Sequence, residues 1–499
     1  MVRTIAAKEM LDQISSPKFV FLFVVSTVLI VFSLYTGSSA YVGARNEYQA
    51  TDALSRRELE NRKNYFEISQ FGVKVARAPS PLSAIAGGVS SALGRSARVR
   101  PEQQPEFAPP PLADTPVLAV LGELDFNVVV KIFLSLFVLL LTYDAIAGEK
   151  ENGTLKAVLA NPVPRTRLLL GKMLGLFGVF LMATAAPAVV GILIMKVGFG
   201  IELASGDWLR LVGVAFASGL YLLALFAIGM LVSTSTSRSA VAFLVLLLIW
   251  VAFVEVIPKA SPMIAGQIRP APSYASLQSE RDRLQGEFQR SMFQVMSSAF
   301  ARAGVGPGAG GAPTTPEEDA RRQAKLDSTM NRGRDSLQQD LNAKLSAVDV
   351  SYRNRQDAMT RLALFLSRFS PAAAMSHAVE TMAGTDFEMH RRWRDDLISF
   401  RGGLEAFLKA KGVTFGGFRM VVRSSTTTTS GGTRSHEVRI GGPDSESALD
   451  LSALPKFSVR PESSLDALGR AAPDLAIMAA WAAVALLLSF GKFLKYDVR

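Results

Sequence analysis

Few residues in this sequence have the types and spacing that chemistry requires. Gly171-Lys172 matches the end of a phosphate-binding loop, but Met173 follows it and no glycine stands five positions before Gly171. His436-Glu437 lacks a second histidine four positions on, so a zinc-protease helix is not encoded. We therefore predict no catalytic residues, no metal site and no ATP hydrolysis by this chain alone.

The composition excludes several other function classes. Cysteine is absent, which rules out disulfides, thiolate metal sites and cysteine nucleophiles. His377, His390 and His436 stand in dissimilar contexts, and we interpret them as surface or packing residues. The glycine-rich run at 306–310 follows no predicted strand and is interpreted as a hinge. The net charge of +11 is spread along the chain without a compact basic module, so nucleic-acid binding is not predicted.

One polar segment has the pattern of a docking element. Gly153 permits a turn and Thr154 can cap the helix that follows. Leu155, Val158 and Leu159 then form an apolar edge beside charged residues, as on a short amphipathic helix. A helix of this kind is suited to docking against a soluble partner.

The elements that must position this segment are membrane helices. Nearly half of the residues are apolar and the mean hydropathy is positive, which soluble globular chains seldom show. A membrane-spanning helix needs about 20 mostly apolar residues. Six segments meet this test, approximately at 19–34, 126–143, 168–197, 208–232, 240–257 and 475–494, the first being the shortest. In the third, Gly171 and Gly175 form a G-x-x-x-G pair that would let another helix approach closely.

The distribution of Lys and Arg predicts the orientation of these helices. Basic residues flank the spans on one side, whereas the opposite short loop, 198–207, has none and carries Glu202 and Asp207. The positive-inside rule then places both termini in the cytoplasm of an inner-membrane protein. A cleaved signal peptide is an alternative for the first segment, but Ile5 and Met10 among charged residues favour an interfacial amphipathic helix before an uncleaved span.

The two long loops would lie outside the cytoplasm. Loop 37–125 is polar and then rich in Pro, Ala, Gly and Ser, so much of its second half is expected to be irregular. Loop 258–473 has two helical apolar stripes separated by the Gly- and Pro-rich stretch 304–316, which predicts a long antiparallel helical hairpin. Two β-rich runs, 415–423 and 436–440, predict a small β-hairpin.

The expected fold is an all-α polytopic membrane protein of six transmembrane helices with a large, mainly helical extracytoplasmic domain. The expected division is residues 1–36 with the amphipathic helix and first span, the outer loop 37–125, spans two to five in 126–257 with a cytoplasmic loop at 144–167, the extracytoplasmic domain 258–473, and the last span with a cytoplasmic C-terminus in 474–499.

The segment YDAIAGEKENGTLKAVLANPVPRTRLLLGKMLG, residues 143–175, resembles the first cytoplasmic loop of ABC type 2 exporter permeases. The matching positions are Glu149, Glu151, Gly153, Thr154, Leu155, Pro162, Arg165, Gly171 and Lys172. Weaker matches at 368–371, 382–385 and 454–457 look like the subgroup with a large loop between the fifth and sixth helices, similar to the permeases of nitrous oxide reductase maturation and gliding motility.

The resemblance implies a membrane subunit that dimerises with a second copy or a paralogue and binds two cytosolic ABC ATPase subunits. ATP and Mg would be bound by those subunits, and this chain would bind no cofactor. The ATPase-coupling residues implied are Glu149, Glu151, Gly153, Thr154, Leu155, Val158, Leu159, Pro162 and Arg165.

Other function classes stay open at this point. The long hairpin motivates a structural or signalling membrane tether whose arm recruits an extracytoplasmic protein partner. A membrane enzyme is disfavoured, because no catalytic set of residues converges within the spans.

Overall fold

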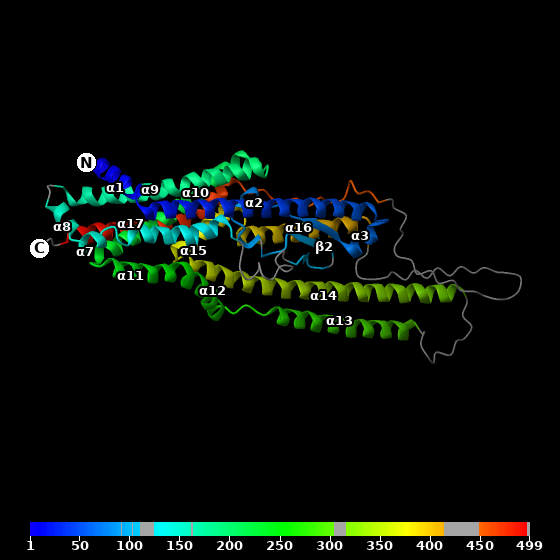
Figure 1. The fold of residues 1–499 in the computed structure, drawn as a ribbon. Helices are drawn as coiled ribbons and strands as arrows, with labels where there is room; N and C mark the ends of the chain where they lie inside the picture. The colour runs from blue at the N-terminus through cyan, green and yellow to red at the C-terminus, as the bar shows by residue number, and fades with distance from the viewer. Residues whose placement is uncertain are drawn as a thin grey trace.

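A computed structural model of the chain describes residues 1–90, 92–101, 103–109, 124–160, 163–303, 316–413 and 449–496. The molecule is elongated, with a helical bundle at one end and a long two-helix arm reaching past a smaller domain at the other (Figure 1). Both termini lie at the free end of the bundle (Figure 1). We call this end the termini side and the opposite end the hairpin side.

Among the described residues, six helical segments are long and apolar enough to cross a membrane, which confirms the predicted number. The first span is α2 (Pro17–Glu60), and the second consists of α5 (Phe126–Val128), η4 (Val129–Leu134), α6 (Ser135–Thr142) and α7 (Ala147–Glu151). The third consists of α9 (Arg165–Leu193) and η5 (Ile194–Gly198), and the fourth is α10 (Ser205–Ser235). The fifth consists of α11 (Ser239–Val251), η6 (Ala252–Val256) and α12 (Ile257–Ile268), and the sixth is α17 (Ser464–Leu494).

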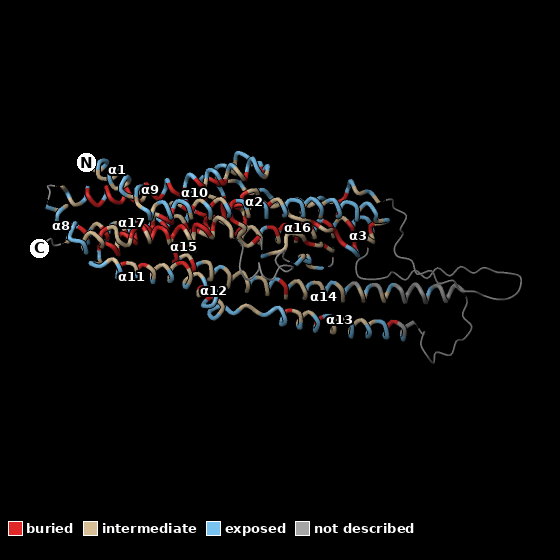
Figure 2. The backbone as a smooth tube through the Cα atoms, viewed as in Figure 1, coloured by how far each residue is buried: buried red, intermediate tan, exposed pale blue. Residues whose placement is uncertain are grey.

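The fourth span is the centre of the bundle. In its most apolar stretch 67% of α10 is buried, against 17% for the fifth span, so the rest of the molecule leaves most of α11 uncovered (Figure 2). Gly229 of α10 lies directly against Thr142 of α6, where a Cβ atom would come within 2.1 Å of the threonine hydroxyl. The small residue therefore lets the two helices approach closely.

The first span has the shortest apolar segment but forms the longest of the six described helical segments. Helix α2 has 44 residues and continues far beyond the expected boundary at residue 36. Its polar extension is stabilised by tertiary contacts: the Ser55 hydroxyl donates to the Lys74 carbonyl at 2.5 Å. Gly37 packs against η1 (Pro81–Ala84), where a Cβ would lie 2.0 Å from the Ala84 carbonyl oxygen. The helix thus links the bundle to the domain on the hairpin side.

The loop after α2 contains short regular elements in both halves, and residues 110–123 of its second half, where irregular structure was predicted, lie outside the described residues. It forms α3 (Tyr65–Phe71), η2 (Gly88–Ser90) and an antiparallel sheet in the order β1 (Val73–Ala76), β2 (Ser96–Val99), β3 (Glu106–Phe107). The buried faces of β1 and β2 pack on α16 (Phe387–Ala410) in a second apolar core around Trp393. That core, which involves a helix almost 300 positions later, overrides the irregular local composition. The runs 415–423 and 436–440 lie outside the described residues.

The predicted helical arm is confirmed. Helices α13 (Tyr274–Ala303) and α14 (Pro316–Ser367) lie side by side and antiparallel (Figure 1). The Arg281 guanidinium of α13 donates twice to Asp349 of α14, at 3.0 and 2.6 Å. At about 1.5 Å per residue, the 52 residues of α14 extend roughly 80 Å. After α14 the chain returns to the bundle as α15 (Pro371–Ala383), which packs against α10 and α17.

Candidate coupling site on the termini side

The segment that joins the second and third spans lies at the tip of the termini side (Figure 1). It consists of α7 and of α8 (Thr154–Leu159), which meet at Gly153. Gly153 has φ +74°, a left-handed conformation that favours glycine, so the predicted turn is formed there. The helix N-cap is Gly153 itself, and the Thr154 hydroxyl instead donates to the Glu149 carbonyl at 3.3 Å. The expected capping role of Thr154 is therefore wrong.

Two hydrogen-bonded contacts fasten the start and middle of α7 to the end of α10. The backbone amides of Ile146 and Ala147 donate to the Ser233 hydroxyl oxygen at 3.0 and 3.1 Å. The Lys150 ammonium donates to the carbonyls of Thr234 and Thr236 at the end of α10. Because those carbonyls are the unpaired acceptors of a helix terminus, a cation there is doubly favourable.

Glu151 fastens the end of α7 to the fifth span. Its carboxylate accepts from the Ser239 amide at 2.9 Å and from the Ser239 hydroxyl at 2.7 Å. Ser239 is the first residue of α11, so this carboxylate satisfies a free amide at a helix N-terminus. Glu151 is itself exposed, which leaves it within reach of a docking protein.

Glu149 turns inward and holds a buried lysine. Lys172 of α9 is only 4% exposed, and its ammonium lies 2.6 Å from Glu149 Oε1 and 2.8 Å from Glu9 Oε1. Glu9 belongs to α1 (Val2–Ile14), the short helix before the first span. We call Glu9, Glu149 and Lys172 the ion triad; it joins α1, α7 and α9 in one contact.

The ion triad was not recognised from the sequence, although a signal for it exists. Lys172 lies inside an apolar segment predicted to span the membrane, where an ammonium requires a carboxylate partner. The pattern could not identify Glu9, which is 163 positions away.

The remaining predicted residues lie near the same end of the molecule. Leu155 is fully buried in the bundle core, while Val158 and Leu159 pack partly against it. The Arg165 guanidinium donates to the carbonyls of Leu494 and Tyr496, both at 2.8 Å, and so holds the end of the sixth span. Pro162 lies outside the described residues.

The glycine pair of the third span faces α1. A Cβ on Gly171 would lie 2.6 Å from the Ile5 side chain, and a Cβ on Gly175 would lie 2.8 Å from the Ala6 carbonyl oxygen. The two glycines let α1 lie against α9 closely enough for Glu9 to reach Lys172. The helix that approaches the pair is the short N-terminal one.

The six apolar helices define a multi-pass membrane protein. On its termini side, the second, third, fourth and fifth spans meet at the polar segment formed by α7 and α8. The chain belongs to the ABC-2 family of transporter proteins, whose family model matches residues 3–498. The resemblance to ABC type 2 permeases is thereby confirmed, and the protein is a membrane subunit of that transporter class.

A curated relative matches a short part of the chain. Over 40 residues the sequence is 60% identical to the probable ABC transporter permease protein NosY of Pseudomonas aeruginosa. The match covers 8% of this chain and 14% of that protein. It agrees with the subgroup that the sequence indicated, and family membership favours a transporter subunit over a membrane tether.

Proposed function

We propose that this chain is the inner-membrane permease of an ATP-driven exporter, and that a separate cytosolic ABC ATPase docks on α7 and α8. The termini side is then cytoplasmic, as the distribution of Lys and Arg indicates. Two ATPase subunits would bind and hydrolyse ATP with Mg, and a second copy of the chain or a paralogue would complete the membrane unit.

The observation that carries this proposal is the set of contacts made by α7. This five-residue helix is joined to α9 through Lys172, to α10 through Ser233 and to α11 through Ser239. A force applied to α7 therefore reaches three spans without passing through a flexible connection. Helix α8 leaves Thr154 and Lys156 exposed, so a partner can contact the segment from the aqueous side.

Because the chain has no cysteine, docking can be tested by single-cysteine crosslinking. Lys156→Cys on exposed α8 is expected to crosslink to a co-purified ATPase subunit that carries Walker motifs. Ser279→Cys, exposed on α13 at the hairpin side, serves as the matched control and should give no such product. A crosslink from position 279 but not from 156 would place the ATPase on the wrong side and refute the proposal.

Coupling is tested separately from docking. Glu151→Lys reverses the charge that caps α11 while leaving the ion triad intact. We expect the ATPase to remain bound but substrate-stimulated hydrolysis to fall by about tenfold, because one lost charged hydrogen bond is worth roughly 1.5–3 kcal/mol. Unchanged stimulation would remove Glu151 from the coupling element.

A further inference from the structure

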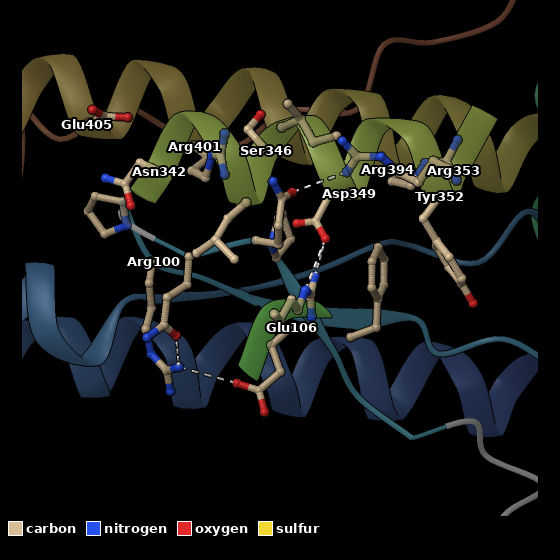
Figure 3. Close-up of a pocket in the computed structure, with 18 of the residues that line it drawn as sticks. Arg100, Glu106, Asn342, Ser346, Asp349, Tyr352, Arg353, Arg394, Arg401 and Glu405 are labelled. Atoms are coloured by element: carbon tan, nitrogen blue, oxygen red, sulfur yellow. Dashed lines mark hydrogen bonds and ion pairs between the residues drawn. The ribbon is translucent and has the colours of Figure 1, made fainter. Parts of the chain in front are cut away.

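A large polar cavity lies on the hairpin side, away from the coupling site. Its volume is about 1080 Å³, slightly above the range of about 300–1,000 Å³ for small-molecule sites. Three parts of the chain line it: residues 100–107 around β3, the facing sides of α13 and α14, and α16 (Figure 3).

The charges of the lining are unbalanced. Among the described residues of the lining, six side chains are Arg or Lys and three are carboxylates. Each carboxylate already has a cationic partner within the lining: the pairs are Arg100–Glu106 at 3.5 Å, Arg281–Asp349 at 2.6 Å and Lys409–Glu405 at 2.7 Å. The three other guanidinium groups have no carboxylate partner among the described residues of the lining.

Those three groups are Arg353 on α14 and Arg394 and Arg401 on α16; Arg353 and Arg394 lie together on one side of Asp349 and Arg401 lies on the other side (Figure 3). Arg394 pairs with Asp357 at 3.1 Å, whereas Arg353 donates to the neutral amide of Gln104 at 3.2 Å. Burial, together with Arg394 and Arg401, lowers the pKa of Arg353. Within the described part of the chain, the buried Nε–H groups of Arg394 and Arg401 have no hydrogen-bond acceptor.

Such buried donors are costly unless an acceptor reaches them, and a guanidinium is best matched by a planar carboxylate. The rest of the lining is rich in groups that both donate and accept. It contains seven carboxamide side chains, among them Gln338 and Asn342, and the hydroxyl groups of Tyr274 and Tyr352. Sugar hydroxyls, which also donate and accept, match this set.

We propose that the cavity binds an acidic oligosaccharide, with sugar carboxylates on Arg353 and on Arg401 and with hydroxyls on the carboxamides. Tyr352 and Phe107 add aromatic side chains to the lining, and sugar rings pack favourably against such side chains. An acidic peptide is a poorer fit, because strand addition needs an extended edge and β3 has only two residues. The site is independent of ATPase docking. Its ligand would contact α13 and α14 of the arm together with β3 and α16 of the smaller domain.

The test uses the full chain in detergent, without nucleotide, so that its result does not depend on the proposed function. Tetragalacturonate is titrated by calorimetry and compared with maltotetraose, a neutral sugar with the same number of rings, and with tetraglutamate. Saturable binding of tetragalacturonate is expected, with maltotetraose at least about tenfold weaker because it lacks the charged partner. Absence of saturable tetragalacturonate binding, or tighter binding of tetraglutamate, would overturn the proposal.

Variants separate the site from the general charge of the arm. Arg353→Gln with Arg401→Gln should weaken tetragalacturonate binding by at least about tenfold while leaving the thermal midpoint unchanged. Arg283→Gln with Arg290→Gln removes the same charge from exposed positions of α13 outside the lining and should change the affinity less than about twofold. Equal losses in the two double variants would show nonspecific attraction and overturn the assigned site.

Discussion

Replacing Lys172 by methionine tests whether the ion triad stabilises the termini side. The substitution keeps the length of the side chain but leaves Glu9 and Glu149 without their cation. Removal of one partner of a buried ion pair costs about 3–5 kcal/mol. The two carboxylate side chains are 16% and 25% exposed, so both keep some contact with water and the lower value, about 3 kcal/mol, applies.

This loss converts into a modest thermal shift in so long a chain. With an unfolding entropy of about 2 cal/mol/K per residue, 499 residues give roughly 1 kcal/mol/K, and the midpoint should fall by about 3 °C. The assay is differential scanning fluorimetry in detergent at a fixed scan rate. Lys156→Met, which removes an exposed lysine of α8, is the control and should leave the midpoint unchanged.

The discriminating variant neutralises all three groups. Lys172→Met combined with Glu9→Gln and Glu149→Gln has no uncompensated charge, so its midpoint should return to within about 1 °C of the original protein. If this triple variant is no more stable than Lys172→Met alone, the carboxylates do not depend on the lysine. The reasoning about the ion triad would then fail.

Three further predictions concern the hairpin side. Gly37→Ala should destabilise the protein by about 1–3 kcal/mol, because the new methyl group meets a backbone carbonyl. Gly43→Ala, on the same helix in open space, should be neutral or should stabilise the protein by up to about 1 kcal/mol. The thermal midpoints of the two variants test this difference. Arg281→Met should speed hydrogen exchange in α13 by leaving a buried carboxylate unpaired, whereas Arg283→Met, which removes only exposed pairs within that helix, should not. Burial and neighbouring guanidinium groups lower the pKa of His390 to about 4, so the folded state disfavours protonation of this side chain. The stability of the protein should therefore fall as the pH drops from about 6.5 towards 4. In thermal scans across this range, His390→Gln should make the midpoint less dependent on pH.

The features that the sequence predicted correctly are those with a local physical cause. Each span is encoded by about 20 contiguous apolar residues, and the arm by apolar stripes around a Gly- and Pro-rich turn. Gly153 likewise stands where a left-handed turn is needed. In each case the residues that determine the structure are neighbours in the chain.

The features that it missed depend on contacts between distant residues. The extension of α2 beyond the apolar stretch is held by a hydrogen bond from Ser55 to a strand and by close packing at Gly37. The Glu149 side chain points inward because it pairs with Lys172, and the buried Lys172 ammonium is paired in addition with Glu9. Local composition assigned α2 an early end and gave no position for the Glu149 side chain, because neither partner is nearby in the sequence.

The two sites are connected by one continuous series of rigid contacts. Asp349 and Tyr352 line the cavity from α14, and at the end of that helix Arg368 makes a two-pronged ion pair with Asp474 of the sixth span, at 2.8 and 3.3 Å. The other end of that span is held by Arg165, close to α8. A ligand that moved α14 relative to the bundle would therefore either break the Arg368–Asp474 ion pair or move the sixth span together with α14. Since such a pair is costly to break where it is partly buried, the sixth span should move with the arm.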